Sequence, residues 1–362
     1  MIRVAYLCEF STLLGGERSL LTFLQAARGS VQPIVICPES GDLPRELERM
    51  GIPQLSWTRS SKKDDVAVFD RIQREGFEIL HGNSLSMAEV IRRAMERTGL
   101  PGVLHIRDIA KLSQRRWEII KQIDGAIGVS RAVCQWLSSE GVEEFRLHHI
   151  YNGVGAEIGP SSSLSTRGEL GLPAHKRLVA CIGQICLRKG QDVFLRACQR
   201  VATEFQDVDF LVIGERYSAK DESIEFERML HGISESAELS GRVHFLGYRH
   251  DVRAIAWHLD LVAVTSRQEP LSRVLIESLA AGVPCVASRV GGSEEIITDN
   301  RFGRLFTSDD DDELARSMIE MLRDDSLKPG VMRDGPAFIR EKFSADQQVA
   351  RILDVYRYLL AR

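Results

Sequence analysis

The sequence has no long hydrophobic run, no excess of charge of one sign and no paired cysteines. No segment approaches the roughly 18 uninterrupted apolar residues of a membrane-spanning helix, and the apolar start MIRVAYLCEF lacks a cleavage site and is expected to form a first strand. The net charge is −4, from 47 Lys and Arg against 51 Asp and Glu, which provides no general attraction for nucleic acid. The seven cysteines lie mostly in apolar runs without a Cys-x-x-Cys pair, a pattern typical of reduced, buried thiols that indicates no metal site. We therefore expect a cytoplasmic protein with no cofactor and no metal, with peripheral contact at the inner face of a membrane as an alternative.

The composition is that of a globular protein, with 44% hydrophobic and 27% charged residues, and 362 residues suffice for about two domains. Short β-branched runs alternate with amphipathic helical patterns and glycine turns, as parallel βαβ units require, and this alternation occurs twice. The expected strands are 2–7, 33–37, 79–81, 102–106, 125–129 and 147–151 in the first half, and 178–182, 209–213, 243–246, 261–265, 284–287 and 303–306 in the second. The sequence thus predicts an α/β protein with two doubly wound parallel sheets.

The boundary between the halves is expected in GPSSSLSTRGELGLPAHK, residues 159–176, whose Ser, Gly and Pro content is typical of an exposed connection. The last helical pattern, 345–360, has no strand of its own, so it must pack on a domain already built, which we expect to be the first. The predicted domains are residues 1–165, joined by a C-terminal helix over 345–362, and residues 166–344.

The most informative segment is LVAVTSRQEPLSRVLIESLAAGVPCVASRVGGSEEII, which reads as strand, loop, helix, strand, loop and helix. Its first loop follows the strand 261–265 and therefore lies at the carboxyl edge of a parallel sheet, where ligands bind. The helix after Pro270 opens with backbone amides that favour an anion, those of Leu271, Ser272 and Arg273. Glu269 and Glu277 flank this helix start and can accept hydrogen bonds from sugar hydroxyls, although unrelated surface charge explains their spacing equally well.

A second candidate site follows the strand 178–182, in the segment ACIGQICLRKGQDVFLRA. Arg188 and Lys189 precede a helix start there, and two cations with helix amides can stabilise the charge of a departing pyrophosphate. A pair of solvated surface cations is the commoner interpretation of an isolated Arg-Lys. Only the coincidence with the segment around Glu269 favours a phosphate site.

The first half offers weaker signals. Gly15 and Gly16 form a turn between the first strand and the first helix, which allows a ligand to approach the backbone closely, but the Gly-x-Gly-x-x-Gly spacing of a nicotinamide site is absent. His81 and His105 end predicted strands, a position in which a single histidine is more often structural than catalytic.

At these residues the chain resembles glycosyltransferase family 4, retaining enzymes of the GT-B fold, in which two Rossmann-like domains face each other across a cleft. EPLSRVLIE resembles the family's E-x7-E motif, which implies that Glu269 contacts the donor sugar and Glu277 the ribose, while the amides of 271–273 hold the phosphates. Lys189 matches the family's phosphate lysine. The resemblance implies further donor-binding positions at Gly15 and Gly16 in LLGGERSLL, at Gln184, at Gly214 and at Tyr248 in FLGY.

Several positions depart from the family's pattern. Gln184 stands where a phosphate-binding arginine is usual, so Arg188 is expected to take that role. Arg107, in HIRD, replaces a histidine, and Gly155 replaces the aspartate after Asn-Gly-Val. We predict that Glu269, Lys189, Arg188 and Arg107 are catalytic, while these departures leave an inactive homologue as an alternative.

The resemblance implies a metal-independent, retaining glycosyltransferase that moves a sugar from a nucleotide-diphosphate sugar to a hydroxyl of a carbohydrate or glycolipid acceptor, in glycan, polysaccharide or glycolipid biosynthesis. The first domain would serve the acceptor and the second the donor. Because the leaving phosphate can take the acceptor's proton, no protein base is required. A nucleotide-sugar-binding subunit without activity and a GT-B epimerase that needs no acceptor are the alternatives.

Overall fold

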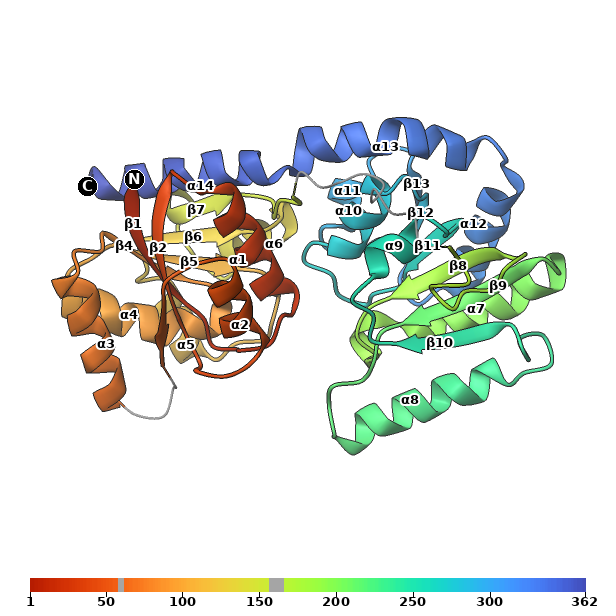
Figure 1. Ribbon diagram of the computed structural model, residues 1–362, viewed down its shortest axis with the longest axis horizontal. Helices are drawn as coiled ribbons and strands as arrows, with labels where there is room; N and C mark the ends of the chain where they lie inside the picture. Colours follow the sequence, from red (N-terminus) through yellow and green to blue (C-terminus); the bar gives the residue numbers. More distant parts are fainter. Residues whose placement is uncertain (58–61, 156–165) are drawn as a thin grey trace. The chain divides into compact units, whose positions relative to one another are not determined.

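The computed structural model describes residues 1–57, 62–155 and 166–362 and consists of two compact units (Figure 1). Unit 1 comprises Met1–Ala156 and Phe343–Arg362, and unit 2 comprises Glu157–Lys342. Each unit is a parallel sheet with helices packed against it, which confirms the predicted α/β class with two doubly wound sheets. Part of the expected connection, residues 159–165, lies outside the described residues.

The described part of unit 1 holds a seven-stranded parallel sheet in the order β3-β2-β1-β4-β5-β6-β7. Its strands are β1 (Ile2–Leu7), β2 (Val31–Cys37), β3 (Gln54–Ser56), β4 (Ile79–Gly82), β5 (Gly102–Ile106), β6 (Gly125–Gly128) and β7 (Leu147–His149). The edge strand β3 was not predicted, because its three residues, QLS, are too few to show an alternating pattern.

Helices cover this sheet on both faces, as the burial of alternate strand residues requires. They are α1 (Gly15–Ala26), α2 (Asp42–Arg49), α3 (Lys62–Arg74), η1 (Leu85–Met87), α4 (Ala88–Thr98), α5 (Gln114–Ile120), α6 (Arg131–Ser139), η2 (Glu144–Arg146) and α14 (Ala345–Leu360). Val4, Tyr6 and Ile79 face a core that also contains side chains of α1, α2 and α14. Gly82, on the other face of β4, lies so close to α4 that a Cβ there would be 2.9 Å from Ile91.

The last helix of the chain, α14, packs against the sheet of unit 1, where Figure 1 shows it in blue beside α1 and β1. The Tyr356 hydroxyl lies 3.1 Å from the Tyr6 hydroxyl and 2.7 Å from His81 Nδ1, so that α14 is joined to two neighbouring strands. Gly125 leaves room for Leu359, whose side chain would be 3.4 Å from a Cβ at that position. Unit 1 is therefore built from two segments that are far apart in the sequence.

The described part of unit 2 holds a six-stranded parallel sheet in the order β10-β9-β8-β11-β12-β13. Its strands are β8 (Arg177–Ile182), β9 (Val208–Ile213), β10 (Val243–Gly247), β11 (Leu261–Val264), β12 (Cys285–Ser288) and β13 (Gly303–Phe306). Its helices are η3 (Leu187–Lys189), α7 (Gln191–Glu204), α8 (Asp221–Ser234), α9 (Val252–Ala256), α10 (Arg273–Ala280), α11 (Ser293–Ile296), α12 (Asp311–Arg323) and α13 (Leu327–Phe343).

The strand order determines where a ligand can bind in each sheet. β8 lies between β9 and β11, so the connections from β8 and β11 leave on opposite sides of the sheet, and the carboxyl ends of such strands are where ligands bind in open parallel sheets. β1 occupies the equivalent place between β2 and β4 in unit 1. Both predicted sites of unit 2 lie in the loops at this switch point, after β8 and after β11.

Candidate functional site

The loops after β8 and β11 bring together Lys189 and Glu269, two predicted catalytic residues that are 80 positions apart in the chain. Lys189 Nζ lies 2.6 Å from Glu269 Oε2, with side-chain exposures of 17% and 7%. The Ser266 hydroxyl donates to the same carboxylate oxygen at 2.9 Å. The cation and the hydrogen bond together offset the cost of burying a carboxylate. A charged pair is thus held at the switch point, beyond the carboxyl ends of β8 and β11.

Glycines allow the backbones of these loops to touch. Gly190 has a φ of +66°, and a Cβ there would lie 2.1 Å from the Thr265 carbonyl oxygen. The Thr265 hydroxyl in turn donates to the Lys189 carbonyl oxygen at 3.0 Å. On the other side, a Cβ at Gly291 would lie 2.1 Å from the Glu269 carbonyl oxygen, which accepts a hydrogen bond from the Gly292 amide at 3.0 Å. Both glycines of the GG pair after β12 were missed in the sequence, where their position between a strand and a helix was the available signal.

The amino end of α10 presents the predicted anion-binding amides. Ser272 is its N-cap, and the Ser272 hydroxyl accepts a hydrogen bond from the Leu275 amide at 3.3 Å. Leu271 and Ser272 are buried, with exposures of 7% and 1%. Arg273 Nη2 lies 2.7 Å from Glu277 Oε1, so these two predicted donor-binding residues form an ion pair along one side of the helix. Glu277 is about half exposed and can still accept a hydrogen bond from a ligand.

Other predicted residues of unit 2 surround these loops. Arg188 is exposed, and its Nη1 donates to the Gln268 carbonyl oxygen at 3.3 Å, next to Glu269. The Gln184 carbonyl oxygen accepts a hydrogen bond from Gln191 Nε2 at 2.8 Å, so Gln184 joins the loop to α7. Two further predicted positions lie after β9 and β10, namely Gly214 and Tyr248.

These two positions differ in their surroundings. Gly214 has a φ of +138°, and a Cβ there would lie 2.0 Å from the Gly183 carbonyl oxygen, so only glycine allows the turns after β8 and β9 to touch. Tyr248 is exposed, and its ring lies 4.7 Å from the His250 ring. Tyr248 follows the edge strand β10, whereas Gly214 follows β9, which lies between β10 and β8.

In unit 1 the structure places Arg107 against the glycine turn. A Cβ on Gly16 would lie 3.8 Å from Arg107 Cδ, and Gly15 is the first residue of α1. Arg107 Nη1 donates to the Asn83 carbonyl oxygen, and Nη2 lies 3.0 Å from His105 Nδ1. The guanidinium is therefore oriented by residues from the ends of two neighbouring strands.

The histidines next to Arg107 are buried and uncharged at neutral pH. Burial lowers the pKa of His81 to about 3, with a further contribution from the nearby Arg107. Burial also lowers the pKa of His105 well below its usual value, and Arg107 and His81 add to this effect. The His81 ring lies 5.4 Å from the His105 ring. These contacts favour the structural role over the catalytic one.

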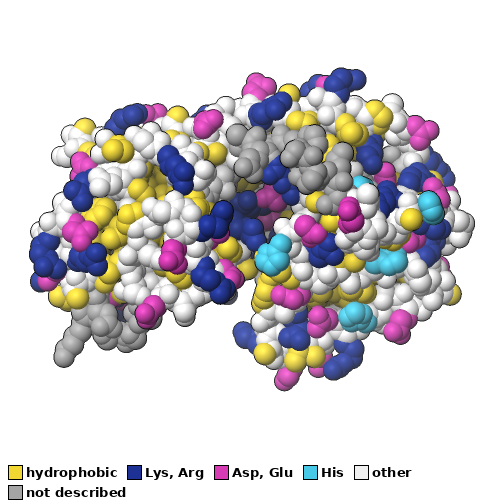
Figure 2. All heavy atoms as spheres, viewed as in Figure 1, with side chains coloured by type: hydrophobic (Ala, Val, Ile, Leu, Met, Phe, Trp, Pro, Cys, Tyr) yellow, Lys and Arg dark blue, Asp and Glu magenta, His cyan; other side chains and the backbone are white. Residues whose placement is uncertain are grey.

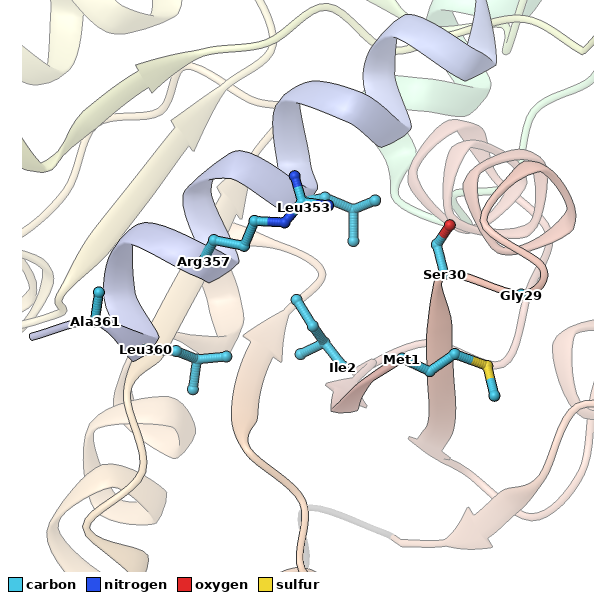
Figure 3. Close-up of a pocket in the computed structure, with 8 residues that line it drawn as sticks. All are labelled: Met1, Ile2, Gly29, Ser30, Leu353, Arg357, Leu360 and Ala361. Carbon is cyan, nitrogen blue, oxygen red and sulfur yellow. The ribbon is translucent and has the colours of Figure 1, made fainter.

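A pocket of about 500 Å³ lies elsewhere in unit 1 (Figure 3). It is lined by residues of the N-terminal strand, the α1–β2 turn and α14, namely Met1, Ile2, Gly29, Ser30, Leu353, Arg357, Leu360 and Ala361. Figure 3 shows these side chains around the amino end of β1, whereas the predicted site residues lie at carboxyl ends of strands. None of the predicted site residues lines this pocket.

The surface and the described side chains allow two further observations. On the face shown in Figure 2, basic and acidic side chains are interspersed over both units. Within residues 1–57, 62–155 and 166–362, no three His, Cys, Asp or Glu side chains are grouped so that they could hold a metal ion. In the same ranges no helix combines the length and the apolar character that crossing a membrane requires.

Two family models match this chain, and together they cover most of it. The model of glycosyl transferases group 1 matches residues 163–332, which include the Lys189–Glu269 pair and α10. The model of glycosyltransferase family 4 matches residues 14–157, which include Gly15, Gly16 and Arg107.

Curated relatives include a lipopolysaccharide core biosynthesis glycosyltransferase, LpsE, of Rhizobium meliloti. It is 27% identical over 60% of this chain and 58% of the relative's own length, so the match leaves much of that protein uncovered. The N-acetyl-α-D-glucosaminyl L-malate synthase of Bacillus anthracis is 24% identical over 84% of this chain and 79% of the relative.

Solved structures show the same fold over nearly the whole chain. HepE of Anabaena, in a crystal with UDP and glucose, superposes with a TM-score of 0.88 at 22% identity and covers 99% of this chain and 100% of that one. Sucrose-phosphate synthase of Thermosynechococcus elongatus reaches a TM-score of 0.80 at 18% identity, with 100% of both chains covered. These similarities confirm the GT-B fold class.

Proposed function

Because the chain belongs to the glycosyl transferases group 1 family, we propose that it transfers a sugar from a nucleotide-diphosphate sugar to a hydroxyl group of a carbohydrate or glycolipid acceptor. The observation that supports this proposal is the Lys189–Glu269 pair beside the amino end of α10. A glycolipid acceptor would bring the protein to the inner face of a membrane.

The proposed chemistry follows from the charges at this site. The diphosphate lies against the first amides of α10 and faces Lys189, while Glu269 and Glu277 accept hydrogen bonds from sugar and ribose hydroxyls. The bond between the anomeric carbon and the β-phosphate oxygen breaks, and its electron pair goes to the phosphate. Lys189 and Arg188 stabilise the charge that develops there. The acceptor oxygen forms its bond on the same face and passes its proton to the leaving phosphate, so the configuration is retained and no metal is needed.

A thermal-shift experiment tests the donor site. Full-length protein is heated with UDP, GDP or ADP, each in the presence of EDTA. At a ligand concentration of about 100 Kd, binding stabilises the folded state by about 2.7 kcal/mol, which raises the melting temperature by several degrees. We expect one of the three diphosphates to give this shift. If none changes the melting temperature, the donor site is wrongly assigned.

A nucleotide-sugar-binding subunit without turnover is the second candidate, because Arg107 replaces the family's histidine and is held by His105 and Asn83. Hydrolysis or transfer of the matching nucleotide sugar separates the two candidates. Release of nucleoside diphosphate supports the transferase, whereas tight binding without any release supports the subunit.

A further inference from the structure

Arg267 lies two residues before Glu269, and its guanidinium contacts three other residues. Its Nη1 and Nη2 lie 2.9 Å from the two carboxylate oxygens of Asp192. Nη1 also donates to the Leu187 carbonyl oxygen at 2.6 Å, and Nε lies 2.7 Å from Asp309 Oδ1. The Arg267 amide donates to the Arg188 carbonyl oxygen at 2.8 Å.

These contacts join the loop that carries Lys189 to the loop that carries Glu269. Leu187 and Arg188 directly precede Lys189, and Asp192 lies in the first turn of α7 just after it. Arginine suits this place because its planar guanidinium binds both oxygens of one carboxylate while further donors reach a carbonyl oxygen. Arg267 therefore connects both ends of the short segment around Lys189 to the loop that carries Glu269.

The buried partner does not depend on Arg267 alone. Asp192 has a side-chain exposure of 6% and also lies 2.9 Å from Arg196. Burial raises the pKa of Asp192, but hydrogen bonds from Arg267 and Arg196 outweigh this effect and lower it overall. If Arg267 is replaced, the carboxylate keeps one cation, so the fold is expected to survive.

We propose that Arg267 is a positioning residue that fixes the place of Lys189 relative to Glu269, so that the diphosphate and the sugar of a donor are bound together. This inference rests on the proposed donor site. In this proposal Arg267 acts through the position of Lys189 and not through a contact with the donor. Without its side chain, the two loops are still joined by the Arg267 amide with the Arg188 carbonyl oxygen, by the bonds of Thr265 with Lys189 and of Arg188 with Gln268, and by the Lys189–Glu269 pair itself, but both ends of the Lys189 segment lose their guanidinium contacts.

The test compares a nucleoside monophosphate with the diphosphate of the same base. UMP and UDP are titrated calorimetrically into the wild type and into the variants R267Q and R267K; if GDP or ADP gives the larger thermal shift, the matching pair replaces them. The second phosphate is the group that needs Lys189 in place. We expect R267Q to weaken UDP binding about tenfold, the equivalent of one strong charged hydrogen bond, and to leave UMP binding nearly unchanged. R267K, which keeps the charge but not the two-pronged geometry, should recover part of the loss.

R323Q is the matched control, because Arg323 pairs with Glu204 at 2.6 Å and links α12 to α7 in the same unit. It should leave both affinities unchanged. Wild-type UDP affinity in R267Q, or an equal loss for UMP and UDP in both Arg267 variants, would overturn the positioning role. A wild type that binds UDP no better than UMP would instead refute the phosphate site itself, so the two failures are distinguishable.

Discussion

At the scale of single residues, Lys189 and Glu269 each provide the countercharge that the other needs when no ligand is present. Glu269→Gln keeps the shape of the side chain but removes its charge and its strong acceptor for a sugar hydroxyl. We expect turnover of the nucleotide sugar to fall by about 10²-fold or more, while the fold survives. Steady-state rates and melting temperature measure both effects.

Glu204→Gln is the control for this variant, because Glu204 is also paired with a cation but lies on the surface of α7. Its turnover should equal that of the wild type. If Glu269→Gln also retained wild-type turnover, the assigned role of Glu269 in the donor site would be refuted.

The buried histidines of unit 1 predict a dependence of stability on pH. His81 has a pKa near 6.5 when unfolded and about 3 when folded, and the pKa of His105 is lowered in the same direction. Between these values the unfolded chain binds more protons than the folded one, so stability falls as the pH drops below about 6.5. The expected slope is about 1.4 kcal/mol per pH unit for each buried histidine.

Denaturant unfolding at pH 7.5, 6.5 and 5.5 measures this slope. His81→Asn, whose amide can replace the contact of Nδ1 with Tyr356, should reduce the slope because one buried histidine no longer contributes, although the smaller side chain lowers stability at every pH. An unchanged slope in this variant would show that another group is responsible.

Residues were predictable where a local motif marked them. Glu269, Lys189 and the glycine turn at Gly15 were singled out because each follows a strand end and precedes a helix start, and the roles assigned to them came from the family resemblance and stay predictions. Arg267 was not singled out, because its contacts with Asp192 and Asp309 join segments that are distant in the sequence. Spacing alone carries no information about such partners.

At the scale of elements, the loop after β8 depends on a glycine. Gly190→Ala would place a Cβ 2.1 Å from the Thr265 carbonyl oxygen, at a φ of +66°. We expect a loss of stability of about 1–3 kcal/mol and weaker binding of the nucleoside diphosphate, because Lys189 is displaced. Denaturant unfolding and calorimetry measure the two effects.

Gly232→Ala is a comparison variant that is expected to have the opposite effect on stability. Gly232 lies within α8, and a Cβ there would have no neighbour within 4 Å. This change should stabilise the protein by about 0.5–1 kcal/mol without any effect on nucleotide binding. If Gly190→Ala behaved in the same way, the loops would not be in the close contact described.

Elements were predictable according to their burial and length. The buried strands appeared as apolar runs, and the predicted bounds agree with β1, β5 and β13. The edge strand β3 was missed because its three residues cannot show an alternating pattern, and α2 was missed because its eight residues carry only two buried leucines, Leu43 and Leu47, among mostly charged side chains. β3 forms by pairing with β2, and α2 forms by packing Leu43 and Leu47 into the core of unit 1, so neither depends on local sequence alone.

At the scale of the whole molecule, the core of unit 1 contains side chains from both ends of the chain. A chain that stops after Ser344 would lose the buried side chains Val349, Ile352, Leu353, Val355, Tyr356 and Leu359. Each contributes about 1.5–3 kcal/mol, so their sum rivals the about 5–15 kcal/mol stability of a domain. We expect this truncation to unfold unit 1, as circular dichroism and solubility would show.

Removal of Ala361 and Arg362 alone is the control, because both residues follow α14 and are exposed. This shorter deletion should leave the melting temperature within a few degrees of the wild type. A soluble, cooperatively folding chain without α14 would contradict the contribution assigned to this helix.

The path of the chain also constrains how related genes can recombine. Unit 2 is inserted between the two segments of unit 1, Met1–Ala156 and Phe343–Arg362, so a single crossover in the middle of two genes would combine one protein's first sheet with another's α14. Tyr356 would then have to pack against the other protein's residues at the positions of Tyr6 and His81. A hybrid that adopts a new donor unit should therefore need two crossovers, one on each side of the insertion, and residues of α14 should be inherited together with those of β1 and β4.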